Sequence, residues 1–150
     1  MREAKTLARF THPNIITIYE VESIEDRWFI VMEYLDGGDL KDLMSKGLNK
    51  RRSLEIVRDV CLALAYARER KYVHRDIKPE NILFDISSRM VLSDFGIARS
   101  MDDGGTQLTQ IGVSVSTPTY MAPEQFETSE VDHRADLYSL GVMFFSDVVW

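Results

Sequence analysis

The feature that most constrains this chain is a run of eight residues, 74–81, with the sequence His-Arg-Asp-Ile-Lys-Pro-Glu-Asn. It contains a carboxylate (Asp76), an ammonium group (Lys78) and an amide (Asn81), and the apolar residues 82–84 follow it directly. Short apolar runs beside polar loops are typical of buried strands. The sequence therefore predicts a loop, next to a strand, that presents an acid–base group, a cation and an oxygen ligand together.

A second polar motif, Asp94-Phe95-Gly96, follows a second apolar run at residues 90–92. Its carboxylate is another hard oxygen ligand, and Gly96 gives the backbone freedom for Phe95 to pack in or swing out. The two loops together supply the base, the cation and the metal-binding oxygens that phosphoryl transfer needs. A single Asp or Asn in a loop more often bonds its own backbone, so the inference rests on the set and its spacing.

Composition narrows the class of protein. The chain has 150 residues, 45% hydrophobic and 28% charged, which is typical of a globular domain. Its net charge of -6 argues against a broad nucleic-acid-binding surface. No apolar run is long enough to span a membrane, and no signal peptide opens the chain. Cys61 is the only cysteine, so we expect a buried, unreactive thiol in a reducing, cytoplasmic setting.

Hydrophobic periodicity and turn residues define the expected secondary structure. The longest helix is expected at residues 53–70, with Ser53 as its N-cap and an apolar stripe on one face. That stripe would consist of Leu54, Val57, Cys61 and Leu64. The other expected elements are a helix at 1–10, a turn at 12–14, an antiparallel hairpin with strands at 15–24 and 27–35, a short helix at 40–46, a long loop at 98–119 and a helix from 132 toward 150.

In this order the motifs resemble a eukaryotic-type (Hanks-type) protein kinase domain of the bacterial serine/threonine branch. The resemblance covers nearly all of the chain, to about Phe144. One three-residue motif is weak, whereas this many in a fixed order are very specific. The matching motifs are Glu3 in a helix, His12-Pro13-Asn14, Glu33-Tyr34, the loop 74–81, Asp94-Phe95-Gly96, Thr117-Pro118, Tyr120-Met121-Ala122-Pro123-Glu124-Gln125 and Asp136-Leu137-Tyr138-Ser139-Leu140-Gly141.

The resemblance implies an α+β, protein-kinase-like fold that is only partly present. Residues 1–35 would be a small-lobe remnant, one helix plus antiparallel strands, ending at the hinge. Residues 36–150 would be an incomplete, mostly helical large lobe, cut within its central helix. We therefore expect one partial kinase domain, truncated at both ends.

The resemblance also assigns roles in catalysis. Asp76 would orient the substrate hydroxyl and accept its proton, and Lys78 would neutralise charge on the transferring phosphate. A lysine at this position implies serine/threonine rather than tyrosine specificity. Asn81 and Asp94 would hold Mg²⁺.

Nucleotide binding is implied for a second set of residues. Glu33 and Leu35 match the hinge, whose backbone groups would bond the adenine of ATP. Asp39 matches a position that bonds ribose, and Leu83 matches the apolar floor below the base. Glu3 matches the helix glutamate that pairs with a strand lysine in this family.

His74 could be taken for a general base, but the resemblance favours a structural role. It would pack beside Phe95, with Leu7 and Ile18 completing a buried stack. Asp136 would anchor this stack from below as an acceptor for backbone groups rather than as a catalytic acid.

Arg75 beside Asp76 suggests control by phosphorylation of the long loop, because a phosphate there could pair with the guanidinium. The candidate sites are Thr109 first, then Thr106 and Ser114.

Three functions remain open at this point. The first is a serine/threonine protein kinase that transfers the ATP γ-phosphate to protein substrates. The second is a kinase-like binding or regulatory module without catalysis, and the third is a non-functional gene fragment. Since these 150 residues contain no Gly-rich phosphate loop and no upstream strand lysine, we expect the chain alone to transfer little phosphate.

Overall fold

The computed structural model describes residues 8–25, 27–95, 118–128 and 131–145. They form a mixed α+β architecture of short antiparallel strands and helices. The elements are β1 (Ile18–Ile24), β2 (Arg27–Met32), α2 (Leu40–Ser45), α3 (Lys50–Glu69), η1 (Pro79–Asn81), β3 (Ile82–Phe84), β4 (Met90–Leu92), η2 (Pro118–Tyr120), α5 (Glu124–Glu127) and α6 (Arg134–Met143). No helix among these residues combines the length and apolar character that a membrane crossing requires.

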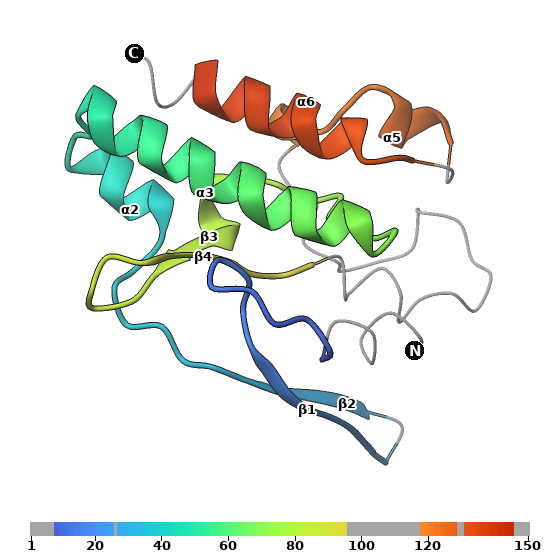
Figure 1. Cartoon of the computed structure of the whole chain (residues 1–150). Coiled ribbons are helices and arrows are strands. Elements are labelled where there is room, and N and C mark those ends of the chain that lie inside the picture. Colours follow the sequence, from blue (N-terminus) through green and yellow to red (C-terminus); the bar gives the residue numbers. More distant parts are fainter. Residues whose placement is uncertain (1–7, 26, 96–117, 129–130, 146–150) are drawn as a thin grey trace.

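Two antiparallel hairpins carry the strands. β1 pairs with β2, and β3 pairs with β4, in separate two-stranded sheets. The β3–β4 hairpin lies between the helices α3 and α6 on one side and the β1–β2 hairpin on the other (Figure 1). The largest fully buried side chains include Leu40, Ile56, Val60, His74, Ile77, Ile82, Met90, Val91, Leu92, Phe95 and Met143. The apolar runs predicted as strands are thus largely buried, which explains their composition.

An extended link, residues 33–39, joins β2 to α2 and lies against β3. The Gly37 N–H donates to the Phe84 carbonyl at 2.8 Å, and the Phe84 N–H donates to the Gly38 carbonyl at 2.9 Å. A Cβ at Gly37 would come within 2.5 Å of the Asp85 carbonyl oxygen. The link can therefore approach β3 this closely only because residue 37 has no side chain.

The residues before β1 pair with the free edge of β4. Ile15 forms an isolated parallel bridge with Leu92. The Leu92 N–H donates to the Asn14 carbonyl at 2.9 Å, and the Ile16 N–H donates to the Leu92 carbonyl at 3.0 Å. The Asn14 side chain also donates to the Met90 carbonyl at 2.8 Å. β4 thus has partners on both edges, which fixes the start of the loop that follows it.

Helix α3 differs from its prediction at the N-terminus and in its buried face. Asn49, not Ser53, is the N-cap, and its Oδ1 accepts the Arg52 N–H at 2.9 Å. Leu64 is buried and Val57 is partly buried against the core, but Leu54 and Cys61 are exposed, so half of the predicted stripe and the predicted buried thiol are wrong. The buried residues are Ser53, Ile56, Val60, Ala63, Leu64 and Ala67. This set has equally helical spacing, and packing against β4 selects it.

Other boundaries also shift. The turn at 12–14 and the antiparallel hairpin are confirmed, but the strands are shorter than predicted, at Ile18–Ile24 and Arg27–Met32. Residues 8–10 are turn and coil rather than the end of a helix, and residues 1–7 lie outside the described part. The last helix begins at Arg134 instead of 132.

Candidate active site

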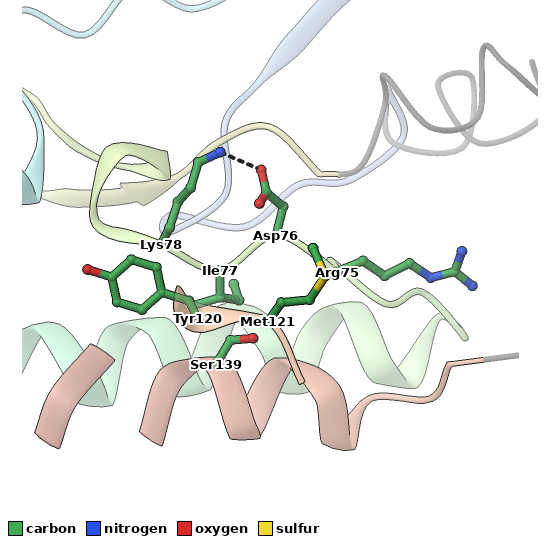
Figure 2. A pocket seen from close by; sticks show the side chains of 7 residues that line it. All are labelled: Arg75, Asp76, Ile77, Lys78, Tyr120, Met121 and Ser139. Carbon is green, nitrogen blue, oxygen red and sulfur yellow. Dashed lines mark hydrogen bonds and ion pairs between the residues drawn. The ribbon is translucent and has the colours of Figure 1, made fainter. Parts of the chain in front are cut away.

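Three polar side chains of the loop between α3 and β3 converge. The Lys78 Nζ lies 2.8 Å from the Asp76 Oδ2 (Figure 2). The Asn81 Nδ2 donates to the same Oδ2 at 3.0 Å and to the Asp76 carbonyl at 2.8 Å. The Asp76 and Lys78 side chains remain partly exposed, whereas Asn81 is buried. A carboxylate, an ammonium group and an amide therefore meet at one accessible point.

The local sequence explains this convergence. Ile77 is buried, so its neighbours Asp76 and Lys78 point to the opposite side of the extended segment. Pro79 starts η1, and its ring holds Lys78 in an extended conformation, with φ −157° and ψ 162°. The η1 turn then brings Asn81 back toward Asp76.

The two predicted metal ligands, Asn81 and Asp94, are connected through Ser93. The Ser93 N–H and hydroxyl donate to the Asn81 carbonyl at 2.9 and 3.2 Å. Asp94 follows with an exposed side chain and a left-handed φ of +54°. In the part of the chain that is described, no group of three or more His, Cys, Asp or Glu side chains could hold a metal ion.

His74 is a buried packing residue, as the sequence predicted. Its ring centroid lies 4.5 Å from that of Phe95, and its Nε2 lies 2.8 Å from the Ser93 carbonyl. The Asp76 N–H donates to its Nδ1 at 3.3 Å, so the proton of the neutral ring is on Nε2. Burial lowers the pKa of His74, and the nearby Asp136 opposes this shift. The neutral ring joins the loop 74–81 to the segment after β4.

Asp136, on α6, holds the backbone of the same loop. Its Oδ2 accepts the His74 N–H at 2.8 Å, and its Oδ1 accepts the Arg75 N–H at 2.7 Å. The Gln125 side chain donates to the Arg75 carbonyl at 3.0 Å. These bonds stabilise Arg75 at a φ of +67°, a conformation that costs a non-glycine residue roughly 1–3 kcal/mol. The prediction that Asp136 is a backbone-holding acceptor is confirmed.

The residues expected to bind nucleotide lie along the 33–39 link and on β3. The Glu33 N–H donates to the Thr17 carbonyl at 2.9 Å. Within the described ranges, the Glu33 carbonyl and the Leu35 N–H have no backbone partner. Asp39 forms an isolated bridge with Leu83, so these two residues are adjacent. Asp39 is also the N-cap of α2, which engages one of its carboxylate oxygens.

Two hollows lie near these elements. The smaller, about 10 Å³, has room for about one water molecule and is lined by Arg75, Asp76, Ile77, Lys78, Tyr120, Met121 and Ser139 (Figure 2). The larger, about 420 Å³, is lined by residues of the link, α2, α3 and the β3–β4 turn, among them Asp36, Leu43, Arg52, Phe84 and Ile86. The two hollows share no lining residue, so the larger one does not include the Asp76–Lys78 pair.

Two residues that hold this region together were not predicted from the sequence. The Arg89 guanidinium contacts both Asp85 and Glu33, and the Tyr72 hydroxyl donates to the Phe95 carbonyl at 3.1 Å. The four-residue spacing of Asp85 and Arg89 is the one local signal for the first, and nothing local signals the second. Several predicted residues lie outside the described ranges, namely Glu3, Leu7, Gly96, Thr106, Thr109 and Ser114.

The sequence matches the family described as protein kinase domain over residues 1–149. Three curated relatives are serine/threonine-protein kinase PknB of Mycobacterium tuberculosis (37% identical), serine/threonine-protein kinase PknD of the same species (44%) and the probable serine/threonine-protein kinase SCO3848 of Streptomyces coelicolor (39%). The alignments cover 96%, 93% and 96% of this chain but 24%, 21% and 22% of those proteins.

The chain therefore spans about a quarter of the length of the curated relatives it matches. The family match extends from the first residue to the last but one, and it includes every residue of the site built above. The chain belongs to the protein kinase domain family.

Proposed function

We propose that this site transfers the γ-phosphoryl group of ATP to serine or threonine hydroxyls of protein substrates. The observation that carries the proposal is the convergence of Lys78 and Asn81 on the Asp76 carboxylate at 2.8 and 3.0 Å. Phosphoryl transfer depends mainly on positioning and on charge stabilisation, and this arrangement provides both.

Each side chain has a chemical role in this proposal. Asp76 orients the attacking hydroxyl and accepts its proton, while the Lys78 ammonium neutralises charge on the phosphoryl oxygens. The contact between Asp76 and Lys78 means that a hydroxyl at the carboxylate would also lie close to the cation. One loop would thus serve both the nucleophile and the transferred group.

Mg²⁺ fits the donor set of Asn81 and Asp94. Because Asn81 donates through its Nδ2, its Oδ1 is the atom left for a cation, and Asp94 adds an exposed carboxylate. Mg²⁺ favours a few protein oxygens completed by phosphates and water, which agrees with the small number of ligands here. When bound with ATP, the ion would neutralise phosphate charge.

The nucleotide base would lie between the 33–39 link and β3. The Glu33 carbonyl and the Leu35 N–H, which have no backbone partner among the described residues, are suited to adenine, and Leu83 offers a half-buried apolar surface. Asp39, adjacent to Leu83, would bond the ribose. In this proposal residues 1–35 are the small-lobe part and hinge, and residues 36–150 belong to the large lobe.

A second candidate, a kinase-like binding module without catalysis, is favoured by one observation. The 150 residues contain neither a Gly-rich phosphate loop nor a strand lysine to pair with Glu3. Both would strengthen the hold on the phosphates, so we expect weak transfer by the 150-residue chain on its own.

Two measurements on the same protein separate the candidates. Binding of Mg²⁺–ADP is followed by the fluorescence of a labelled nucleotide, and transfer by radiolabelled ATP with a serine/threonine peptide mixture. A kinase shows both, with transfer that is weak but measurable in this chain, and Asp76→Asn reduces the transfer rate by about 10²–10⁴ without loss of nucleotide binding.

Glu69→Gln, at an exposed carboxylate on α3, is the matched control and should change neither quantity. Nucleotide binding without transfer would favour the binding module. Absence of both from the wild-type chain would contradict both candidates.

A further inference from the structure

The Arg89 guanidinium joins three segments that are distant in the sequence. Its Nε lies 2.9 Å from the Asp85 Oδ2, its Nη1 donates to the Pro13 carbonyl at 2.7 Å, and its Nη2 lies 3.2 Å from the Glu33 Oε2. Each contact uses a different nitrogen, so all three nitrogens of the planar guanidinium are engaged. Arg89 thus ties the β3–β4 turn to the residues before β1 and to the start of the 33–39 link.

Asp85 orients Arg89 for these contacts. Its Oδ1 accepts the N–H groups of Ser87 and Arg89 at 2.8 and 2.9 Å, which closes the turn between β3 and β4. Its other oxygen holds the Arg89 Nε. The Asp85 carboxylate therefore fixes the backbone of Arg89 and also directs its side chain toward Glu33.

Glu33 accepts the hydrogen bond from the Arg89 Nη2 and is itself bonded to Thr17. Its Oε1 accepts the Thr17 N–H at 2.8 Å, and its own N–H donates to the Thr17 carbonyl at 2.9 Å. Four residues further on, the Gly37 N–H bonds the Phe84 carbonyl of β3. Residues 34–36 are therefore held at both ends by the same hairpin, through Arg89 at one end and Phe84 at the other.

We propose that Arg89 is a positioning residue, which holds the backbone of Glu33 and Leu35 at a fixed distance from the β3 strand that carries Leu83. The inference rests on the proposed function, in which these groups form the two sides of the adenine site. If both sides of the site are already fixed, the free energy of nucleotide binding does not include the cost of ordering the link. An exposed ion pair alone would contribute little, but this guanidinium is shared among two carboxylates and a carbonyl.

The test compares ADP with inorganic pyrophosphate, both measured with Mg²⁺, because only ADP carries the base. Arg89→Met should weaken ADP binding roughly five-fold and leave pyrophosphate binding unchanged. Arg89→Lys keeps the charge but loses the fork and should weaken ADP binding to a smaller extent. Arg51→Met, at an exposed arginine on α3, is the matched control and should change neither. Equal weakening of both ligands, or of neither, would overturn the proposal.

Amide hydrogen exchange without nucleotide gives an independent readout. Arg89→Met should speed exchange at Thr17 and Glu33, whose N–H groups bond within the clamped segment, and leave the middle of α3 unchanged. No acceleration at these two amides would overturn the proposal whatever the nucleotide data show. If wild-type protein binds pyrophosphate and ADP equally or not at all, the proposed nucleotide function fails, and exchange alone then decides whether Arg89 holds the link.

Discussion

The carboxylate of Asp136 accepts the backbone N–H of His74 at 2.8 Å, and both residues are buried. The same carboxylate accepts the Arg75 N–H at 2.7 Å, so one side chain of α6 satisfies two consecutive amides of the loop 74–81. Among the described residues, every buried side-chain nitrogen and oxygen has a hydrogen-bond partner. Desolvation raises the pKa of Asp136, and the N–H donors and His74 act against that shift.

Replacing Asp136 should therefore be costly. Asp136→Ala leaves the His74 N–H without its acceptor in a buried site, so we expect a loss of about 3 kcal/mol in the free energy of unfolding. Asp132→Ala, at an exposed carboxylate before α6, is the control and should cost less than about 1 kcal/mol. Urea unfolding measures both, and equal losses would refute the role assigned to Asp136.

Stability should fall as the solution is made acidic, partly through His74. Burial holds its folded-state pKa below the ordinary value of 6.5, so below that pH the unfolded chain binds a proton that the folded chain does not. The contribution of His74 is complete above about pH 6.5 and is lost as the pH falls toward the folded pKa, at up to about 1.4 kcal/mol per pH unit.

Urea unfolding of the wild type and of His74→Asn between pH 7.5 and 5.5 tests this sign. The variant is less stable throughout, but its stability should depend less steeply on pH. His12, whose pKa burial also lowers, accounts for part of the remaining slope. Parallel curves for the two proteins would show that His74 does not titrate in this way.

The start of α3 gives a third prediction. Asn49→Ala removes the oxygen that accepts the Arg52 N–H and should cost about 1 kcal/mol. Ser53→Ala should be nearly neutral, because Ser53 lies inside the helix and its hydroxyl bonds the Asn49 carbonyl rather than an N–H group of the first turn. Thermal unfolding distinguishes the two positions, and a larger effect at Ser53 would restore it as the cap.

Two glycines should respond oppositely to alanine. Gly37→Ala puts a Cβ within 2.5 and 2.7 Å of two backbone carbonyl oxygens, so we expect a loss of more than about 2 kcal/mol and a displaced link. Gly141→Ala, on α6, meets nothing within 4 Å and should stabilise the protein by about 0.5–1 kcal/mol. Thermal unfolding of both variants provides the comparison, and similar signs would contradict the packing described for the link.

Residues 74–84 and 90–94 were predictable because their signals are local. An apolar run, a proline after Lys78 and polar residues at close spacing determine each element within a few residues. The face of α3 that is buried was not predictable from the sequence of the helix alone, since Leu54 and Cys61 lie on an equally regular stripe. The choice between the two faces depends on β4, which packs against α3 from more than twenty positions away.

The contacts of Arg89 with Glu33 and Pro13 were even harder to predict from the sequence. Arg89 contacts Glu33 across 56 positions of the sequence and Pro13 across 76. The local sequence around an arginine in a surface turn does not indicate such distant partners. Burial of Asp136 against the loop 74–81, by contrast, was expected only because the resemblance supplied it. The polar residues proposed for catalysis are thus easier to predict than the residues that hold them in place.

The pairing of the segment at residues 14–16 with β4 has a consequence during synthesis. The Asn14 side chain bonds the Met90 carbonyl, a separation of 76 positions. At about 5–20 residues per second, a ribosome takes roughly 4–15 seconds to make the residues between them. For that interval residues 15 and 16 lack the strand that they pair with, and these two isoleucines, Ile15 and Ile16, are buried only in the folded chain. A chaperone that recognises short apolar stretches would therefore have access to this segment, and release should follow the appearance of β4.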